Sequence, residues 1–162
     1  MNYSDILRSV KTTEHARDLL SEIDILLESL FKTDSKAFEK ALNSISAVSS
    51  QMLKEIFIRN YGSFENKAMI KECLIGLKEE MQKLKILKIS LALEVSENLI
   101  DNLFNWVLKN LKAGIILNIN TDKSIIGGAI IEFEGRYKDF SLKKALEEVF
   151  ATKRAEILSF MD

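Results

Sequence analysis

Few residues of this chain have side chains that commonly carry out chemistry. The chain has one histidine, His15, and one cysteine, Cys73. His15 falls on the polar side of a predicted helix beside Glu14 and Arg17, which favours a solvated surface histidine over a catalytic one. Cys73 falls on an apolar helical stripe, where a buried and unreactive thiol is the usual state. A single histidine and a single cysteine cannot supply the ligand spacing of a zinc site, so we expect no metal.

The glycine pair Gly127-Gly128 is the other feature that could serve a ligand. A phosphate-binding loop places its glycines ahead of a helix, whereas this pair leads into a predicted strand. Glu132 and Glu134 alternate along that strand without a histidine or a nucleophile beside them, and we interpret them as a solvated strand edge. We therefore predict neither catalytic residues nor a cofactor.

The composition points to an ordinary soluble globular protein. Of the 162 residues, 47% are hydrophobic and 29% are charged, and the formal net charge is −1. This balance argues against general nucleic-acid binding or a polybasic membrane surface. The sequence has no apolar run long enough to cross a bilayer, no pattern of a secretory signal, and only one cysteine, so we expect a cytoplasmic protein.

The first half of the sequence predicts helices. It has no proline, and its apolar residues recur at steps of three and four over residues 16–31, 38–56 and 70–84, behind a short helix over 4–10. Thr12 or Thr13 can cap the second helix, Asp34 or Ser35 the third, and Gly62 fits a C′ position. Helices of this length are marginal alone, so we expect them to pack as a bundle.

The spacing of the apolar residues changes from a helical to a strand period near residues 84–87. Apolar residues then alternate over 87–93, a helix is predicted over 96–111, and a second strand over 115–119. The Gly-Gly strand follows, turns at Gly135 and leads to a last helix from residue 142. The predicted fold class is α+β. A helical bundle over residues 1–84 precedes a small β-α-β-β-(β)-α domain over 85–162.

Two features of the second half could bind a partner. Trp106 lies off the main stripe of its helix, and we favour a core position for it over an exposed interface anchor. The last helix can be capped by Asp139 or Ser141, and its first two turns carry a stripe that we expect to pack on the domain's own sheet. The apolar end of this helix either packs against its own domain or docks a partner. The candidate interface residues are Ile157, Leu158, Phe160 and Met161.

The stretch from Asp122 to Leu146 resembles the carboxyl-terminal signature of the delta subunit of bacterial F-type ATP synthase. The mitochondrial counterpart of that family is the oligomycin-sensitivity-conferring protein. The signature has an aspartate, an aliphatic pair and Gly-Gly, then a strand and turn, and then an Asp-x-Ser step into a basic helix. The resemblance extends mainly over residues 87–150. The matching residues are Asp122, Ile125, Ile126, Gly127, Gly128, Asp139, Ser141, Lys143, Lys144 and Leu146.

The resemblance implies a structural subunit without catalytic activity or cofactors. In this family the helical domain holds the amino-terminal helices of the alpha subunits, and the second domain holds the carboxyl-terminal ends of the membrane-anchored b subunits. Such a subunit belongs to the peripheral stalk, where it keeps the catalytic head still while the rotor turns. It lies on the cytoplasmic side of the inner membrane. The bundle expected here is shorter than the six-helix bundle that is usual in the family.

Two alternatives stay open from the residues alone. The E subunit of a V- or A-type stalk also ends in a small α+β domain, but it usually begins with one long charged helix, unlike the interrupted helices predicted here. A small enzyme or nucleic-acid-binding module with a helical extension is disfavoured by the near-neutral charge and by the missing His, Cys and Gly-rich clusters.

Overall fold

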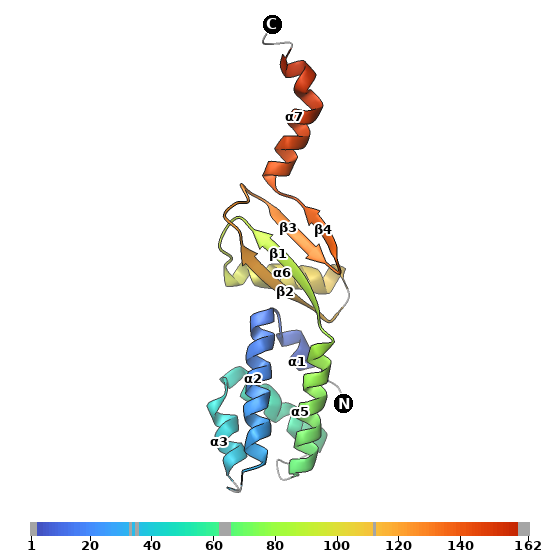
Figure 1. The fold of residues 1–162 in the computed structure, drawn as a ribbon. Helices are drawn as coiled ribbons and strands as arrows, with labels where there is room; N and C mark the ends of the chain where they lie inside the picture. The colour runs from blue at the N-terminus through green and yellow to red at the C-terminus, as the bar shows by residue number, and fades with distance from the viewer. Residues whose placement is uncertain (1–2, 33, 35, 62–65, 112, 159–162) are drawn as a thin grey trace. The chain divides into compact units, whose positions relative to one another are not determined.

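The chain divides into two compact units, Met1–Lys85 and Ile86–Asp162. The computed structural model describes residues 3–32, 34, 36–61, 66–111 and 113–158. In the described residues, the first unit contains helices α1 to α5 and the second contains a four-stranded sheet with helices α6 and α7 (Figure 1). The α+β fold class predicted from the two hydrophobic periods is confirmed.

Two helices of the first unit begin at polar residues whose side chains accept a hydrogen bond from the first turn. The Thr12 hydroxyl accepts from the backbone N–H of His15 at 3.2 Å, so Thr12 is the N-cap of the second helix. The Asn66 side chain accepts from the N–H of Met69 at 3.2 Å and caps the fifth. The helices are α1 (Ser4–Ser9), α2 (Thr13–Leu30), α3 (Ala37–Ser44), α4 (Ala47–Tyr61) and α5 (Lys67–Gln82).

The core of this unit forms where its helices pack, with α2 against α3 and α5, and α3 against α4. Leu26, Leu53 and Leu74 are fully buried, and burial of each such side chain is worth roughly 1.5–3 kcal/mol. The rings of Phe38 and Phe57 pack at a tilt with their centroids 6.1 Å apart. These contacts supply the stability that none of the helices has alone.

The prediction of one continuous helical stripe over residues 38–56 is wrong. Helix α3 ends at Ser44, Ile45 has extended backbone angles, and α4 begins after Ser46. The Ser46 hydroxyl accepts from the N–H of Ser49, and the Ser44 hydroxyl donates to the carbonyl of Ala41. Serine side chains that bond to nearby backbone groups compete with helix continuation. Apolar spacing alone did not reveal this break. The predicted C′ residue Gly62 lies outside the described residues.

The second unit is built on a four-stranded sheet in which the strands lie in the order β2-β1-β3-β4. Strand β1 pairs antiparallel with β3, and β3 pairs antiparallel with β4. Glu134 and Gly135 both have positive φ, at 48° and 75°, and form the two-residue turn of the β3–β4 hairpin. The elements are β1 (Lys85–Leu91), α6 (Glu97–Asn110), β2 (Ile115–Thr121), β3 (Ala129–Phe133), β4 (Arg136–Asp139) and α7 (Leu142–Leu158).

Helix α6 covers one face of this sheet. Phe104 and Val107 of α6 pack in one buried cluster with Ile89 of β1 and Leu117 of β2. The opposite face is mixed, since the buried Ile116 of β2 lies on it, and there the Nζ of Lys88 lies 3.0 Å from a carboxylate oxygen of Glu132. Glu132 is therefore paired across β1 and β3, on an inner strand instead of a solvated edge.

Three further expectations for this unit are corrected. Trp106 is 56% exposed, so the core position favoured for it is wrong. Leu93 is exposed because β1 already ends at Leu91. Gly127 and Gly128 do not lie within a strand, since β3 begins at Ala129. Pairing, and not alternation of residue types, decided where each strand stopped.

Candidate partner-binding site

The sequence signature of the second unit folds into one junction that fixes the start of α7. At its beginning, Asp122 forms a tight turn with Ser124. One carboxylate oxygen of Asp122 accepts from the N–H of Ser124 at 2.9 Å and from its hydroxyl at 2.7 Å. The N–H of Asp122 donates to the carbonyl of Leu91 at 2.8 Å, which ties the turn to β1. Ile125 is buried behind the turn, whereas Ile126 is exposed.

The glycine pair lies directly against the chain that enters α7. The N–H of Leu142 donates to the carbonyl of Gly127 at 2.8 Å, and the N–H of Phe140 donates to the carbonyl of Ala129 at 2.8 Å. Gly128 has φ +85°, and a Cβ placed there would meet the carbonyl oxygen of Phe140. The same Cβ would lie 3.1 Å from the Cα of Ser141. The close approach expected of this pair is thus real at Gly128, where the neighbour is backbone.

Ser141 is the N-cap of α7, which decides between the two candidates. Its hydroxyl accepts from the N–H of Lys144 at 3.3 Å, and its carbonyl accepts from the N–H of Ala145 at 3.2 Å. Asp139 supports the cap instead of forming it, because its carboxylate accepts from the N–H of Ser141 at 2.7 Å. Ser141 is 5% exposed. The first turn of α7 is therefore held by the Ser141 cap, and the Asp139 carboxylate in turn holds the cap residue.

Both aspartates of the signature are stabilised as carboxylates. Hydrogen bonds from the Ser124 side chain and then from its backbone N–H lower the pKa of Asp122. The Ser141 side chain and backbone N–H likewise lower the pKa of Asp139, with smaller help from Lys144 and Lys143. A carboxyl whose pKa is lower in the folded state adds stability above its unfolded pKa and loses it as pH falls through the folded pKa.

We expect Asp139→Asn to flatten the acid sensitivity of the second unit. The amide keeps an acceptor oxygen but cannot be protonated, so the variant is less stable than wild type near neutrality. The stabilities of the variant and the wild type should converge as pH falls from about 5 through and below the ordinary aspartate pKa near 3.9. The measurement is the urea midpoint at a series of pH values. Parallel curves for the two proteins would contradict this role of Asp139.

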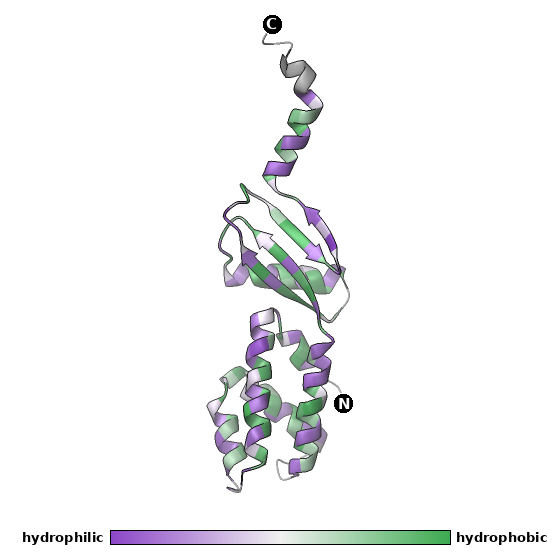
Figure 2. Ribbon diagram, viewed as in Figure 1, coloured by the Kyte–Doolittle hydropathy of each residue, from purple (hydrophilic) through white to green (hydrophobic). Residues whose placement is uncertain are grey.

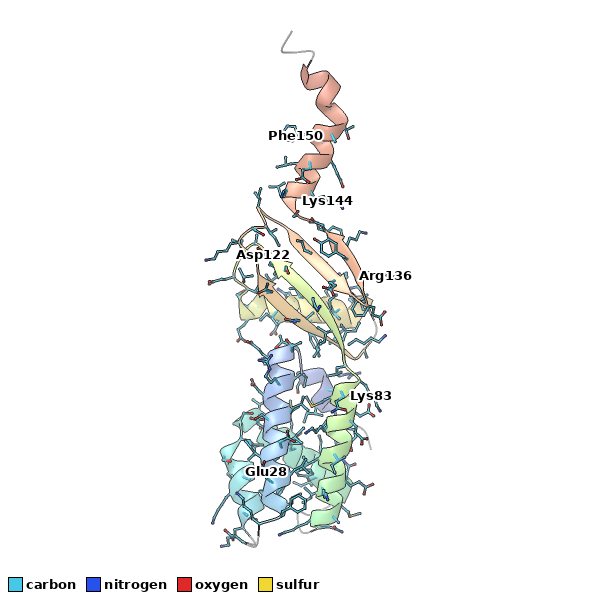
Figure 3. The ribbon with its side chains drawn as sticks, in the orientation of Figure 1. Glu28, Lys83, Asp122, Arg136, Lys144 and Phe150 are labelled. Carbon is cyan, nitrogen blue, oxygen red and sulfur yellow. The ribbon has the colours of Figure 1, made fainter. Side chains whose placement is uncertain are left out.

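The apolar stripe of α7 is exposed, which contradicts the expectation that it packs on the sheet. Leu146 is 41% exposed and Phe150 is 59% exposed, and Leu142 and Val149 lie between these values. Figure 2 shows hydrophobic and hydrophilic residues interleaved along α7, and Figure 3 shows Lys144 and Phe150 projecting from it. We call the exposed set the α7 stripe; it consists of Leu142, Leu146, Val149 and Phe150.

Only part of the predicted interface at the end of the chain lies within the described residues. The backbones of Ile157 and Leu158 belong to the last turn of α7. Their side chains lie outside the described part of the structure, as do Phe160 and Met161 as a whole. The interface at these four residues therefore stays a prediction, and sequence reasoning overlooked the exposure of the α7 stripe. The sequence did contain a signal for this exposure, because the helix over 97–110 already supplied an apolar face to cover so small a sheet.

A groove of about 710 Å³ lies within the first unit, between α1, α2 and the start of α4. Its floor includes the buried side chains of Ile6, Val10 and Leu19. His15 and Val48 are exposed on its rim. His15 is thus a surface histidine, as predicted, but it borders an apolar recess that the sequence did not indicate. Recesses of this size and lining can receive an apolar side chain of a ligand or partner.

The described residues contain no group of three or more His, Cys, Asp or Glu side chains able to hold a metal ion. Cys73 is buried, as its stripe position predicted. Among the helices described, none is long and apolar enough to span a membrane.

The first unit thus presents a surface groove, and the second presents an exposed amphipathic helix whose first turn is held by the junction. The sequence matches the ATP synthase delta (OSCP) subunit family over residues 7–152. It is also 26% identical to the ATP synthase subunit delta of Pelagibacter ubique (strain HTCC1062) over 134 residues, which covers 75% of this chain and 70% of that protein.

The chain belongs to the ATP synthase delta (OSCP) subunit family. It is therefore a structural subunit of the F-type ATP synthase, a complex of ATP synthesis and ion transport, and a peripheral component of its stalk. This assignment favours the delta subunit over the E-subunit and the enzyme or nucleic-acid alternatives.

Proposed function

We propose that this chain links the catalytic head of the rotary ATP synthase to the membrane-anchored b subunits and so resists the torque of the rotor. The two units, Met1–Lys85 and Ile86–Asp162, act as separate domains. The helical domain holds the amino-terminal helices of the alpha subunits, and the α+β domain holds the carboxyl-terminal ends of the b subunits. The protein performs no chemistry and works on the cytoplasmic side of the membrane.

The observation that carries the proposal is the exposed α7 stripe. A helix of 17 residues is marginal in water, and its large apolar side chains gain little while they remain half exposed. Completing the burial of each is worth roughly 1 kcal/mol, before the cost of association is subtracted. An amphipathic helix of the b subunit that lies along the stripe would supply this burial. Ile157, Leu158, Phe160 and Met161 would extend the same surface.

The groove between α1, α2 and α4 is our candidate for one alpha contact. An amphipathic helix can place an apolar side chain over Ile6 and Leu19 while its polar residues meet the rim. The rim carries Asp18 and Glu22 as well as Lys11, so a helix with basic residues facing the two acids fits best.

A reconstitution tests the linking role. The intact chain is mixed with a catalytic head that lacks its own delta subunit and with the soluble part of the b subunit. We expect b to sediment with the head only when the chain is present. If b reaches the head equally well without the chain, or if the chain binds one partner alone, the linking function is wrong.

A further inference from the structure

Gly76 stands in the middle of α5, where glycine weakens a helix and therefore needs a packing reason. The reason is Tyr3, the residue just before α1. A Cβ at Gly76 would lie 2.6 Å from the hydroxyl oxygen of Tyr3 and 3.4 Å from the ring carbon that carries it. The same hydroxyl donates to the carbonyl of Cys73 at 3.2 Å, one turn earlier in α5. The hydroxyl end of Tyr3 thus occupies a notch that glycine leaves open.

This contact fixes the position of α1, which lies beside α5 (Figure 1). The carbonyl of Tyr3 accepts the first hydrogen bond of α1, so the residue in the notch also begins the helix. A helix of six residues is unstable alone and is held in place by its tertiary contacts. The other anchors are the buried side chains of Ile6 and Val10. The ion pair between Asp5 and Arg59 is exposed on both sides and adds little.

α1 also forms one wall of the groove in the first unit. Ile6, Ser9, Val10 and Lys11 line this groove, and its other lining residues come from α2 and from the start of α4. The most extensive packing in this unit joins α2 to α3 and to α5, so α1 is a peripheral segment. Short peripheral segments with few anchors open at a lower free energy than the whole domain. The shape of the groove therefore depends on how firmly α1 is held.

We propose that α1 is a strap, latched by Tyr3 in the notch at Gly76, and that its docking completes the groove. The strap opens while α2 to α5 stay packed, and an open strap leaves the groove without one wall. A helix seated in the groove contacts the docked strap and so holds it closed. This last step rests on the proposed function, in which that helix is the amino-terminal helix of an alpha subunit.

Cys73 supplies the probe for the strap, because it is the chain's single cysteine and is 1% exposed. A thiol reagent reacts with it only when this turn of α5 is uncovered. Gly76→Ala should speed the labelling of Cys73 about fivefold or more, because the new methyl group pushes the Tyr3 hydroxyl off the Cys73 carbonyl. The labelling rate should depend little on urea, since release of a short strap exposes far less surface than global unfolding.

Two further variants make this test specific to the latch. Tyr3→Phe removes the hydroxyl that the methyl group would strike, so adding it to Gly76→Ala should slow the labelling again. Asp5→Asn breaks the exposed ion pair of the same strap and should leave the rate within about twofold of wild type. Three results would overturn the latch: no faster labelling of Gly76→Ala, still faster labelling of the double variant, or a urea dependence as steep as that of global unfolding.

The link between strap and groove is tested with a synthetic peptide of the amino-terminal helix of the alpha subunit. At ten times its dissociation constant for the intact chain, the peptide should slow the labelling of Cys73 about tenfold, because it binds only when the strap is docked. A peptide that binds without changing the rate would overturn the link to the groove alone. Absence of binding would overturn the alpha contact of the proposed function and the closing of the strap by a partner, whereas the latch is judged by the labelling of the variants.

Discussion

Replacing Gly128 by valine should destabilise the second unit by about 3 kcal/mol, because two costs add at this position. The backbone of Gly128 has φ +85°, which costs an L residue about 1–2 kcal/mol, and more when the side chain is branched. The new Cβ would also strike the carbonyl oxygen of Phe140 and crowd Ser141. A backbone neighbour cannot rotate away as a side chain can, so the start of α7 must shift.

The chain offers a direct way to measure this. Its single tryptophan, Trp106, lies in the second unit, so its fluorescence follows the unfolding of that unit in urea. Two matched variants separate the two costs. Gly135→Ala has φ +75° with open space around the new Cβ and should lose only about 1 kcal/mol. Gly127→Ala meets Leu142 at an ordinary 3.7 Å and should be nearly neutral. An unchanged midpoint for Gly128→Val would show that the close approach is not required.

Replacing Leu146 by aspartate should weaken b binding by about 2 kcal/mol, or roughly 30-fold, and leave the fold nearly unchanged. Leu146 is 41% exposed and sits in the middle of the α7 stripe, so its loss opens no cavity in the domain's own core. A carboxylate there would be buried without a partner in the complex, which is costly. Calorimetric titration with the soluble part of the b subunit measures the affinity, and thermal unfolding measures the stability.

Ala151→Asp is the control for this variant. It introduces the same residue into the same helix on the opposite face, with a similar loss of helix propensity. We expect it to bind b like wild type. Equal losses of affinity in both variants would mean that helix formation, and not the stripe, governs binding. A sharp fall in the melting temperature of Leu146→Asp alone would assign the stripe to the domain's own core.

The sequence by itself determined the α+β class and most of the element order. The change of hydrophobic period from three or four residues to two separates the helices before residue 82 from the strand that starts at Lys85. Gly135 marked the hairpin turn because few residues other than glycine adopt its φ of +75° easily. The order of Asp122, Gly127-Gly128 and Asp139-x-Ser141 was also enough to indicate the family. Asp122, Gly128, Asp139 and Ser141 each serve a local backbone requirement.

Only the tertiary structure decided what each apolar face meets. A periodic stripe specifies that one side of a helix is apolar, but it does not specify a neighbour. The stripe of α6 is covered by the sheet while Trp106 stays outside, and the equally regular α7 stripe is left exposed. The break at Ile45 escaped prediction for a related reason, because serine hydrogen bonds to the backbone interrupted a helix whose apolar spacing continues unchanged. Covering a face requires a second surface at the right place, and in this chain α6 already occupies the sheet face that carries the buried cluster of β1 and β2.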